Sequence, residues 1–292
     1  MPLRFGLIGD GRFGKHYKRL LAEIPGVELA AVVTEETSIT VEDMLRDASI
    51  DAVVIATPPS THATLMSQAL TAGKHVHVEK PMVLSVAEAE KIQPLVLKSG
   101  RICMVGYQYL YNDYIRELKK RMPALGPIRY VMAEHRANGP IRSDVGIFMD
   151  AAPHDLAILE YLFQTGEVAS AVGKRLMITN AERDDFTAVT ARFENGLTAH
   201  LVTTWLAPEK IRRIAIVGQN GSAIYDDVLT ENKLRIFNEQ GDTAPLQITA
   251  GEPLRNELEH FIDCIINTKQ PLTDFEFGLK VTRRCEEILR SI

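Results

Sequence analysis

Three polar side chains have the types and spacing that a proton-transfer reaction requires. Lys80 lies in Glu79-Lys80-Pro81, directly after the strand-like run His75 to Val78. Asp150 and His154 are four residues apart, which places a carboxylate and an imidazole on one side of a helix. An imidazole with an ordinary pKa near 6.5 accepts a proton at neutral pH, and an ammonium group hydrogen-bonds to an oxygen on which negative charge develops. Taken singly, each residue could instead be a surface lysine, a helix cap or a buried histidine.

A glycine-rich loop near the start of the chain could hold phosphates. Gly9-Asp10-Gly11-Arg12-Phe13-Gly14 reads GxGxxG between the strand-like run Leu3–Ile8 and a helical stretch. The first glycine allows a tight turn, the second lets the backbone approach a pyrophosphate, and the third lets helix and strand pack closely. Free amides at the helix start attract the phosphates. The loop therefore predicts dinucleotide binding, with a merely structural turn as the alternative.

The choice between NAD and NADP depends on the residues after the second strand. The run Val27–Val33 ends at Thr34, and Glu35 and Glu36 follow. Either glutamate could bind the ribose hydroxyls, and their charge would repel the additional phosphate of NADP. Both could equally be solvated loop charges. The pattern favours NAD and leaves NADP possible.

The elements that must position these residues form two patterns. Over the first 120 or so residues, strand-like runs alternate with helical stretches, which predicts a parallel sheet with crossover helices. The expected strands are Leu3–Ile8, Val27–Val33, Asp51–Ala56, His75–Val78 and Ile102–Gly106, and the expected helices are Phe13–Glu23, Val41–Asp47, Ser60–Ala72 and Val86–Lys98. Ligands bind beyond the carboxyl ends of such strands, so Lys80 would face the cofactor.

After about Pro123 the strand-like runs alternate in polarity or pair through turns. They are Ile128–Arg136, Val168–Arg175, Phe186–Phe193, Leu197–Trp205, Ile211–Val217 and Ala223–Tyr225, with helices expected at about Ala152–Phe163, Arg255–Asn267 and Phe275–Ser291. Asn195-Gly196 favours a type I′ hairpin turn. Pro153 is expected in the first turn of its helix, which would place Asp150 near the N-cap. An antiparallel or mixed sheet follows.

Composition limits the function classes. At roughly 150 residues per domain, 292 residues predict about two domains. The 33 Lys and Arg against 38 Asp and Glu give a net charge of −5, which disfavours nucleic acid and anionic membranes as main partners. No membrane-spanning run and no signal-peptide layout is expected. Three widely spaced cysteines predict a reducing cytoplasm. His75 and His77 share a strand face without a third ligand, so no metal site is expected.

The sequence resembles the Gfo/Idh/MocA oxidoreductases over nearly its whole length. The matching features are the GxGxxG loop, Asp51 to Pro59 with Ser60-Thr61-His62, Glu79-Lys80-Pro81, Asp150 with His154, and a β-rich second half. The resemblance implies an α/β fold with a Rossmann doubly wound parallel sheet over residues 1–120. It also implies an α+β domain over residues 121–292, with a large, mostly antiparallel open sheet for substrate binding and oligomerisation.

The resemblance also implies roles for single residues. Lys80, Asp150 and His154 would be catalytic. The cofactor would be bound by Gly9, Gly11, Arg12, Phe13, Gly14, Thr34, Thr57, Pro58, His62, Glu79 and Lys80. Tyr107 and Gln108, which follow a strand, could contact substrate or nicotinamide, and Arg136 or Arg142 could bind phosphates. Between Thr34 and Asp43 the chain is shorter than most relatives, a segment that normally helps to cover the adenosine.

A finer resemblance, to nucleotide-sugar 3-dehydrogenases, is carried by four segments. They are Arg136 to Asp144 running into Asp150, Trp205 to Pro208, Tyr225 to Asp227, and Glu252 to Arg255. The expected activity is NAD(P)-dependent hydride transfer between a nicotinamide and a secondary alcohol of a sugar, cyclic polyol or nucleotide sugar. A homodimer or homotetramer is expected. The alternative is a non-catalytic NAD(H)-binding sensor or scaffold, which would need none of the three catalytic residues.

Overall fold

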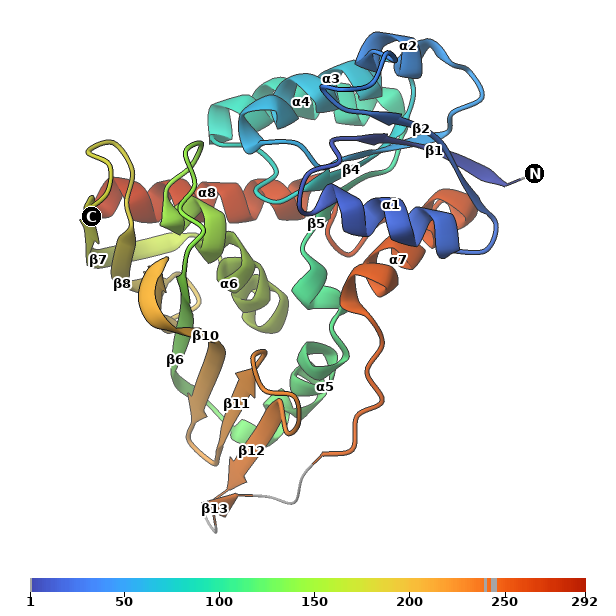
Figure 1. The fold of residues 1–292 in the computed structure, drawn as a ribbon. Coiled ribbons are helices and arrows are strands. Elements are labelled where there is room, and N and C mark those ends of the chain that lie inside the picture. The colour runs from blue at the N-terminus through green and yellow to red at the C-terminus, as the bar shows by residue number, and fades with distance from the viewer. Residues whose placement is uncertain (1, 239–240, 243–245) are drawn as a thin grey trace. The chain divides into compact units, whose positions relative to one another are not determined.

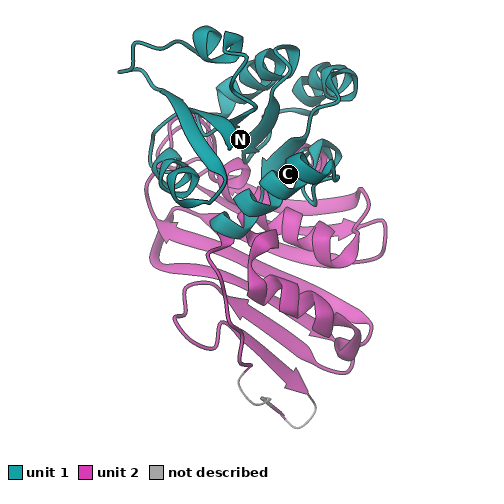
Figure 2. Ribbon diagram, turned by 90° about the vertical axis from the view of Figure 1, so that its right-hand side faces the viewer, with its two compact units in different colours: residues 1–107, 254–282 teal, residues 108–253, 283–292 magenta. Residues whose placement is uncertain are grey.

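The chain divides into two compact units in a computed structural model that describes residues 2–238, 241–242 and 246–292 (Figure 2). Unit 1 comprises Met1–Tyr107 and Leu254–Thr282, and unit 2 comprises Gln108–Pro253 and Arg283–Ile292. This division differs from the predicted one at residue 120. Unit 1 is discontinuous, because a segment from the far end of the sequence packs with the N-terminal strands.

Unit 1 is built on a parallel sheet whose strand order is β2-β1-β3-β4-β5. Its strands are β1 (Leu3–Ile8), β2 (Val27–Val33), β3 (Ala52–Ile55), β4 (His75–Glu79) and β5 (Cys103–Gly106). Helices α1 (Gly14–Glu23) and α7 (Pro253–Asn267) lie on one face, and α3 (His62–Thr71) and α4 (Val86–Ser99) lie on the other (Figure 1). A short helix, α2 (Val41–Arg46), follows β2. All four residues of β3 are buried, as a strand covered on both faces requires.

The C-terminal part of unit 1 completes its core. Phe261 on α7 meets Phe5 on β1 at a ring-centroid distance of 6.1 Å. Beyond α7, Thr273 exchanges hydrogen bonds with Val105 on β5: its carbonyl accepts the Val105 N–H at 2.8 Å, and its hydroxyl donates to the Val105 carbonyl at 2.7 Å. The sequence predicts α7, but it carries no local signal that this helix packs against the N-terminal strands.

Unit 2 is built on a mixed sheet with the order β13-β12-β11-β10-β6-β9-β8-β7. The strands are β6 (Ile128–Asn138), β7 (Val168–Leu176), β8 (Phe186–Phe193), β9 (Thr198–Thr204), β10 (Leu206–Gly218), β11 (Ser222–Asp226), β12 (Leu234–Asn238) and β13 (Gly241–Asp242). β6 and β9 pair in parallel, and the other neighbours are antiparallel. The predicted open sheet, mostly antiparallel, is confirmed. Helix α5 (Asp113–Arg121) and strand β12 were not predicted.

The hairpin between β8 and β9 forms as predicted, but its turn is not type I′. A type I′ turn needs positive φ at both central residues. Gly196 alone has it here, with φ of +87°, and its N–H donates to the Phe193 carbonyl at 2.9 Å. Asn195 instead uses its side chain, whose Oδ1 accepts the Leu197 N–H at 3.0 Å. The loop is therefore one residue longer, with glycine alone in the left-handed region.

Helix α6 (Ile147–Phe163) begins five residues before the predicted start at Ala152. Pro153 consequently lies inside the helix, and the expected N-cap role of Asp150 is wrong. The true start is capped from a distant segment: the Ile147 N–H donates to the Asp184 backbone carbonyl at 2.8 Å, and the Phe148 N–H donates to the Asp184 carboxylate at 2.9 Å. No residue near position 147 in the sequence could reveal this cap.

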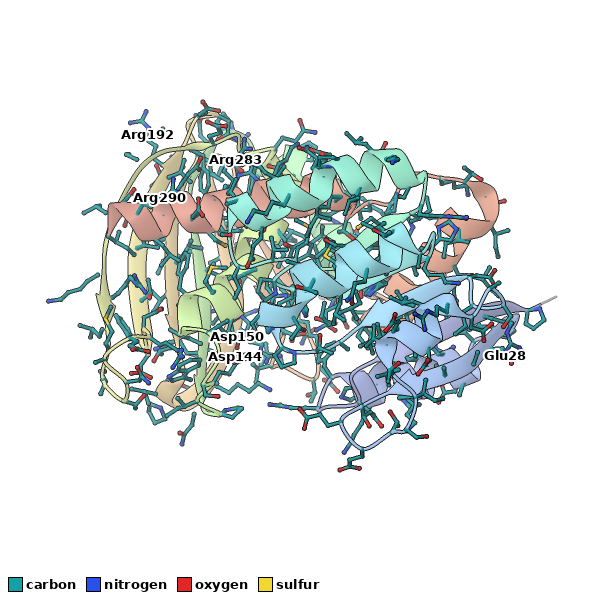
Figure 3. All side chains as sticks on the ribbon, turned by 90° about the horizontal axis from the view of Figure 1, so that it is seen from above. Glu28, Asp144, Asp150, Arg192, Arg283 and Arg290 are labelled. Atoms are coloured by element: carbon teal, nitrogen blue, oxygen red, sulfur yellow. The ribbon has the colours of Figure 1, made fainter. Side chains whose placement is uncertain are left out.

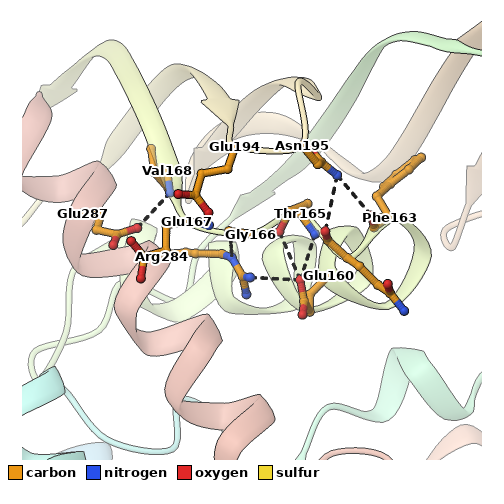
Figure 4. Close-up of polar contacts among 11 residues, drawn as sticks. Glu160, Phe163, Thr165, Gly166, Glu167, Val168, Glu194, Asn195, Arg284 and Glu287 are labelled. Atoms are coloured by element: carbon orange, nitrogen blue, oxygen red, sulfur yellow. Dashed lines mark hydrogen bonds and ion pairs between the residues drawn. The ribbon is translucent and has the colours of Figure 1, made fainter.

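The end of α6 is anchored by a buried ion pair (Figure 4). Arg284, on the last part of α8 (Phe275–Ser291), lies 2.9 Å from Glu160 and donates to the Gly166 carbonyl at 2.6 Å. Glu160 also accepts the Thr165 N–H at 3.0 Å. Both ends of the helix are thus held by polar contacts within unit 2.

None of the described helices is long and apolar enough to cross a membrane.

Candidate active site

The glycine loop in unit 1 has the shape that a pyrophosphate requires. Gly9 has φ of +95°, and a Cβ there would lie 2.6 Å from the Ala56 carbonyl oxygen. A Cβ at Gly14 would lie 2.2 Å from the Gly9 carbonyl oxygen, whereas one at Gly11 would meet no atom within 4 Å. Phe13 is the N-cap of α1 and makes no side-chain cap hydrogen bond. The loop therefore offers an open backbone and a helix N-terminus to an anionic ligand, so it fits a dinucleotide.

Hydrogen bonds bring the predicted cofactor residues to one edge of the parallel sheet. The Gly9 N–H donates to the Val33 carbonyl at 2.9 Å, and the Ala56 N–H donates to the Ile8 carbonyl at 2.8 Å. The residues that follow β1, β2 and β3 therefore adjoin. In the observed strand order the topological switch point lies between β1 and β3, where α/β sheets bind ligands. Lys80 follows β4, the next strand along this edge.

His62 connects two of the predicted motifs. Its ring is fully buried, with Nε2 2.9 Å from the Thr57 carbonyl oxygen and Nδ1 2.9 Å from the Pro81 carbonyl oxygen. The hydroxyls of Thr57 and Thr61 lie 2.6 Å apart. His62 therefore braces the loop after β3 against the Glu79-Lys80-Pro81 segment, while Pro58 is exposed.

The segment after β2 closes into a short turn. The Thr34 N–H donates to the Thr37 hydroxyl at 2.9 Å, and the Glu36 N–H donates to the Thr34 hydroxyl at 3.2 Å. Glu35 and Glu36 are both exposed. Two carboxylates therefore follow the strand that adjoins the glycine loop, at the position where ribose hydroxyls are bound in such folds.

Asp150 and His154 lie on α6 in unit 2, four residues apart as predicted. Arg142 lies 3.1 Å from Asp150 and 2.5 Å from Asp144, so its guanidinium joins the two carboxylates. Figure 3 shows Asp144 and Asp150 close together. The hydrogen bond from Arg142 holds the pKa of the Asp144 carboxyl below its ordinary value. Arg142, predicted to bind substrate, thus contacts a predicted catalytic residue.

The His154 ring has two aromatic neighbours that were not predicted. It stacks on His135 of β6, at 5.9 Å between ring centroids and 15° between planes, and it meets Tyr109 edge-on at 5.0 Å. His154 is only 9% exposed. The one sequence signal for Tyr109 is its place next to Gln108 after the strand β5. The neighbours fix the plane of the imidazole and leave little of it in solvent.

The residue after His154 is a buried acid that sequence reasoning missed. Burial raises the pKa of Asp155 to about 7, although the nearby Arg212 opposes the shift. Asp155 and Arg212 border a cavity of about 10 Å³, room for one water molecule. The sequence offered no signal, because Asp155 reads as an ordinary polar position on a helix.

The remaining predicted substrate residues lie in separate surroundings. Tyr107 is 1% exposed in the core of unit 1, and its ring meets Phe277 at 5.7 Å. Gln108 is half-buried and begins unit 2. Arg136 on β6 lies 3.0 Å from Glu134. The described residues contain no group of three or more His, Cys, Asp or Glu side chains arranged to hold a metal ion.

Two family models match the chain. The model described as "Oxidoreductase family, NAD-binding Rossmann fold" matches residues 3–107, and the "GFO/IDH/MocA C-terminal domain" matches residues 116–224. The first covers the parallel sheet with its glycine loop and Lys80, and the second covers Asp150 and His154. The two family models thus match both the predicted Rossmann part and the predicted β-rich part of the chain.

Individual relatives match over almost the full length. The scyllo-inositol 2-dehydrogenase (NAD(+)) of Bacillus subtilis (strain 168) is 30% identical, covering 94% of this chain and 90% of that protein. The UDP-N-acetylglucosamine 3-dehydrogenase of Acidithiobacillus ferrooxidans is 29% identical, covering 96% and 94%. A solved structure of that enzyme covers 100% of this chain and 98% of its own, with a TM-score of 0.89 and 26% identity. The chain belongs to the Gfo/Idh/MocA family of NAD-dependent oxidoreductases.

Proposed function

We propose that this protein oxidises or forms a secondary alcohol on a sugar, cyclic polyol or nucleotide sugar, with NAD as the hydride carrier. The observation that carries the proposal is the placement of Asp150 and His154 four residues apart on α6. In the same chain, Lys80 follows β4 at the cofactor edge of the parallel sheet. Related dehydrogenases are named for inositols and for UDP-N-acetylglucosamine.

Each of the three residues has a distinct role. His154 takes the hydroxyl proton as general base. Asp150 orients the imidazole and stabilises its charged form, and Arg142 fixes the Asp150 carboxylate from the other side. Lys80 donates a hydrogen bond to the reacting oxygen and stabilises its developing negative charge. NAD, when bound, supplies the nicotinamide that exchanges the hydride.

Among these substrates a nucleotide sugar is the first to test. A UDP-sugar dehydrogenase is similar to this chain over nearly all of both sequences, and the solved structure of that enzyme has the same fold. Arg136 on β6 supplies a guanidinium group of the type that binds phosphate oxygens in pairs. The runner-up substrate class is the inositols.

The test is NADH formation, measured by absorbance, over a panel of UDP-N-acetylglucosamine, myo-inositol, scyllo-inositol and free hexoses. On the best substrate, Lys80→Ala and His154→Ala should each lower kcat/KM by about 10² to 10⁴. Lys98→Ala, an exposed lysine on α4, is the matched control and should not change turnover. Wild-type turnover in both catalytic variants would refute the role assignment. NADH binding without turnover of any panel member would favour the sensor instead.

We propose that the protein forms a homodimer or homotetramer through the sheet of unit 2. Large apolar side chains there are exposed, among them Met132 on β6 (40%) and Val172 on β7 (71%). An apolar sheet face left in water is typical of an interaction surface. Sedimentation at micromolar concentration should give a multiple of 32.5 kDa, and Val172→Asp should lower that mass. A wild-type mass of 32.5 kDa would contradict the proposal.

We also propose a cytoplasmic location. Cys103, Cys264 and Cys285 are all free and buried in the structure. Free thiols of this kind are typical of proteins kept in a reducing compartment. Fractionation of cells that produce the protein tests the location, and recovery outside the cytoplasmic fraction would overturn it.

A further inference from the structure

Unit 1 contains a cluster of four buried ionisable side chains whose protonation plays no part in the proposed reaction. Tyr17 comes from α1, His77 and Glu79 come from β4, and Glu257 comes from α7. Tyr17, His77 and Glu257 have no exposed surface, and Glu79 is 8% exposed. We call these four residues the Tyr17 cluster.

Contacts join the Tyr17 cluster to the backbone of Lys80. The Tyr17 hydroxyl lies 2.5 Å from Oε1 of Glu79 and 3.3 Å from Oε1 of Glu257, which is also 3.2 Å from Nε2 of His77. The second oxygen of Glu79, Oε2, accepts the Lys80 N–H at 3.1 Å. A continuous path of polar contacts therefore runs from α7, through α1, to the residue proposed to act on substrate.

The strand β5 leaves space for these contacts. A Cβ at Gly106 would lie 3.2 Å from the Tyr17 hydroxyl, 3.2 Å from the His77 ring and 3.3 Å from Oε1 of Glu79. A larger residue would press on three members of the cluster at once. The polar groups are therefore closely packed around a position without a side chain.

The cluster cannot hold all its possible charges. Glu79 is faced by Tyr17 from α1, by Glu257 from α7, and by His77 and Lys80 from β4 and its end. Burial raises the pKa of Glu79 to about 7 and that of Glu257 well above its ordinary value, and it lowers the pKa of His77 to about 4. At neutral pH the imidazole is therefore neutral, and the two carboxyl groups together retain a proton.

The Tyr17 hydroxyl has one proton and can donate it to only one of the two carboxyl groups. The shorter contact, to Glu79, marks that residue as the acceptor. An ionised Glu79 forms charge-assisted hydrogen bonds with both Tyr17 and the Lys80 N–H, and these are stronger than the bonds of a neutral acid. Glu257 has one buried oxygen, Oε2, with no hydrogen-bond partner among the described residues. A neutral carboxylic acid leaves such an oxygen unpartnered at a lower free-energy cost than a charged carboxylate does.

We propose that Tyr17 and Glu257 are positioning residues: by sharing protons with Glu79 they set the charge of the carboxyl that holds the Lys80 backbone at the end of β4. The inference rests on the proposed function, in which Lys80 hydrogen-bonds to the reacting oxygen. The Tyr17 cluster and Lys80 then act together, because the protonation state of Glu79 controls how firmly the Lys80 backbone is held.

A pH titration of the Lys80 amide tests the proposal without any substrate. In protein labelled with ¹⁵N-lysine, the Lys80 signal is the one missing from Lys80→Arg, and it should titrate in the wild type and stay flat in Glu79→Gln. Tyr17→Phe removes a donor that favours the ionised Glu79, so the midpoint should move to higher pH. Glu257→Gln removes a neighbouring acid, so the midpoint should move to lower pH.

Matched controls keep the measurement specific. Glu259→Gln changes an exposed acid on α7, two residues from Glu257, and Tyr114→Phe changes a tyrosine of unit 2. Neither should move the Lys80 titration.

In turnover, Tyr17→Phe should lower kcat about tenfold, as expected for one lost hydrogen bond to a charged group, while KM for NAD stays within about threefold.

The two proposals fail on different results. A wild-type Lys80 amide that does not titrate, or midpoints in Tyr17→Phe and Glu257→Gln that move in the same direction, would overturn the positioning role even where Lys80→Ala abolishes turnover. Full turnover in Lys80→Ala would instead remove the proposed catalytic role, whatever the amide titration shows. If Glu257→Gln does not fold, judged by circular dichroism, Tyr17→Phe and Glu79→Gln decide the question.

Discussion

Arg142 is the clearest case in which one side chain connects structure to the proposed chemistry. Its guanidinium lies between Asp144 and Asp150, with nitrogen–oxygen distances of 2.5 and 3.1 Å. A fork of donors on a carboxylate fixes both its charge and its orientation. We infer that Arg142 holds the Asp150 carboxylate in the orientation that His154 requires.

Replacing Arg142 should therefore affect both activity and acid stability. Arg142→Met should lower kcat/KM about tenfold, and the exposed Arg290→Met should have no effect. Because Arg142 lowers the pKa of Asp144 in the folded state, this pair stabilises the fold above the ordinary Asp pKa and loses its effect as pH falls through the lowered value. The stability difference between the wild type and Arg142→Met should thus shrink in acid, measured by urea unfolding. A difference that grows in acid would contradict it.

Residue-level prediction from the sequence succeeded where spacing along the chain carries the information. Asp150 and His154 were correctly placed on one helix because four residues make about one turn. The Tyr17 cluster was invisible, because Tyr17 and Glu257 are 240 residues apart and neither belongs to a motif. His135 was missed for the same reason, since its stacking on His154 depends on the pairing of whole elements.

At the scale of elements, α6 depends on a cap from outside its own sequence. Besides capping Ile147 and Phe148, Asp184 accepts the Thr187 hydroxyl at 2.8 Å and pairs with Arg175 at 3.1 Å. Trp205 packs against Ile147 in the same region. The buried Asp184 carboxylate accepts the Phe148 amide, a hydroxyl and a guanidinium, while the Asp184 backbone carbonyl accepts the Ile147 amide. Together these contacts fix where α6 starts.

Removing that cap should loosen the start of the helix. Asp184→Ala should lower the free energy of unfolding by about 2–3 kcal/mol, because a helix cap and a buried ionic contact are lost together. Urea unfolding followed by circular dichroism measures this loss, with exposed Glu231→Ala as the control. Hydrogen exchange should be faster at residues 147–150 in the variant. An unchanged unfolding midpoint would show that the helix start does not depend on Asp184.

The element pattern of the first half was predictable and that of the second was less so. Short runs rich in apolar residues identified all five parallel strands. The clearest is β3, which is buried throughout and has no polar alternation, as a strand covered on both faces requires. Pro153 suggested a helix start that the distant Asp184 overrides. The type I′ prediction failed because the Asn195 side chain bonds locally instead of adopting positive φ.

At the scale of the whole molecule, stability should depend on buried acids in both units. Burial raises the pKa of Glu79 in unit 1 and of Asp155 in unit 2 to about 7. A carboxyl whose folded pKa is raised binds its proton more tightly in the folded state, so its contribution is full below the ordinary pKa and is lost as pH rises to the raised value. Both groups therefore make the stability of the fold fall as pH rises from about 4 to about 7, and this loss persists at higher pH.

The Asp155 contribution can be isolated by one substitution. The unfolding free energy of Asp155→Asn relative to the wild type should rise as pH goes from about 4 to about 7, and the difference should be about 2 kcal/mol larger at pH 8 than at pH 5. Urea unfolding at both pH values gives the comparison, and Asp226→Asn, half-buried at the end of β11, is the control. A difference that is smaller at pH 8 than at pH 5 would contradict the expected sign.

The discontinuity of unit 1 has a consequence for biosynthesis. A ribosome completes the five parallel strands long before it makes α7, because residues 108–253 are translated in between. Through that interval Phe5 has no Phe261 to cover it, and Tyr17 and Glu79 have no Glu257. The glycine loop is thus translated early, but the core of its unit is complete only when residues 254–282 have been made. During that interval, chaperones that bind exposed apolar surface can bind the nascent chain.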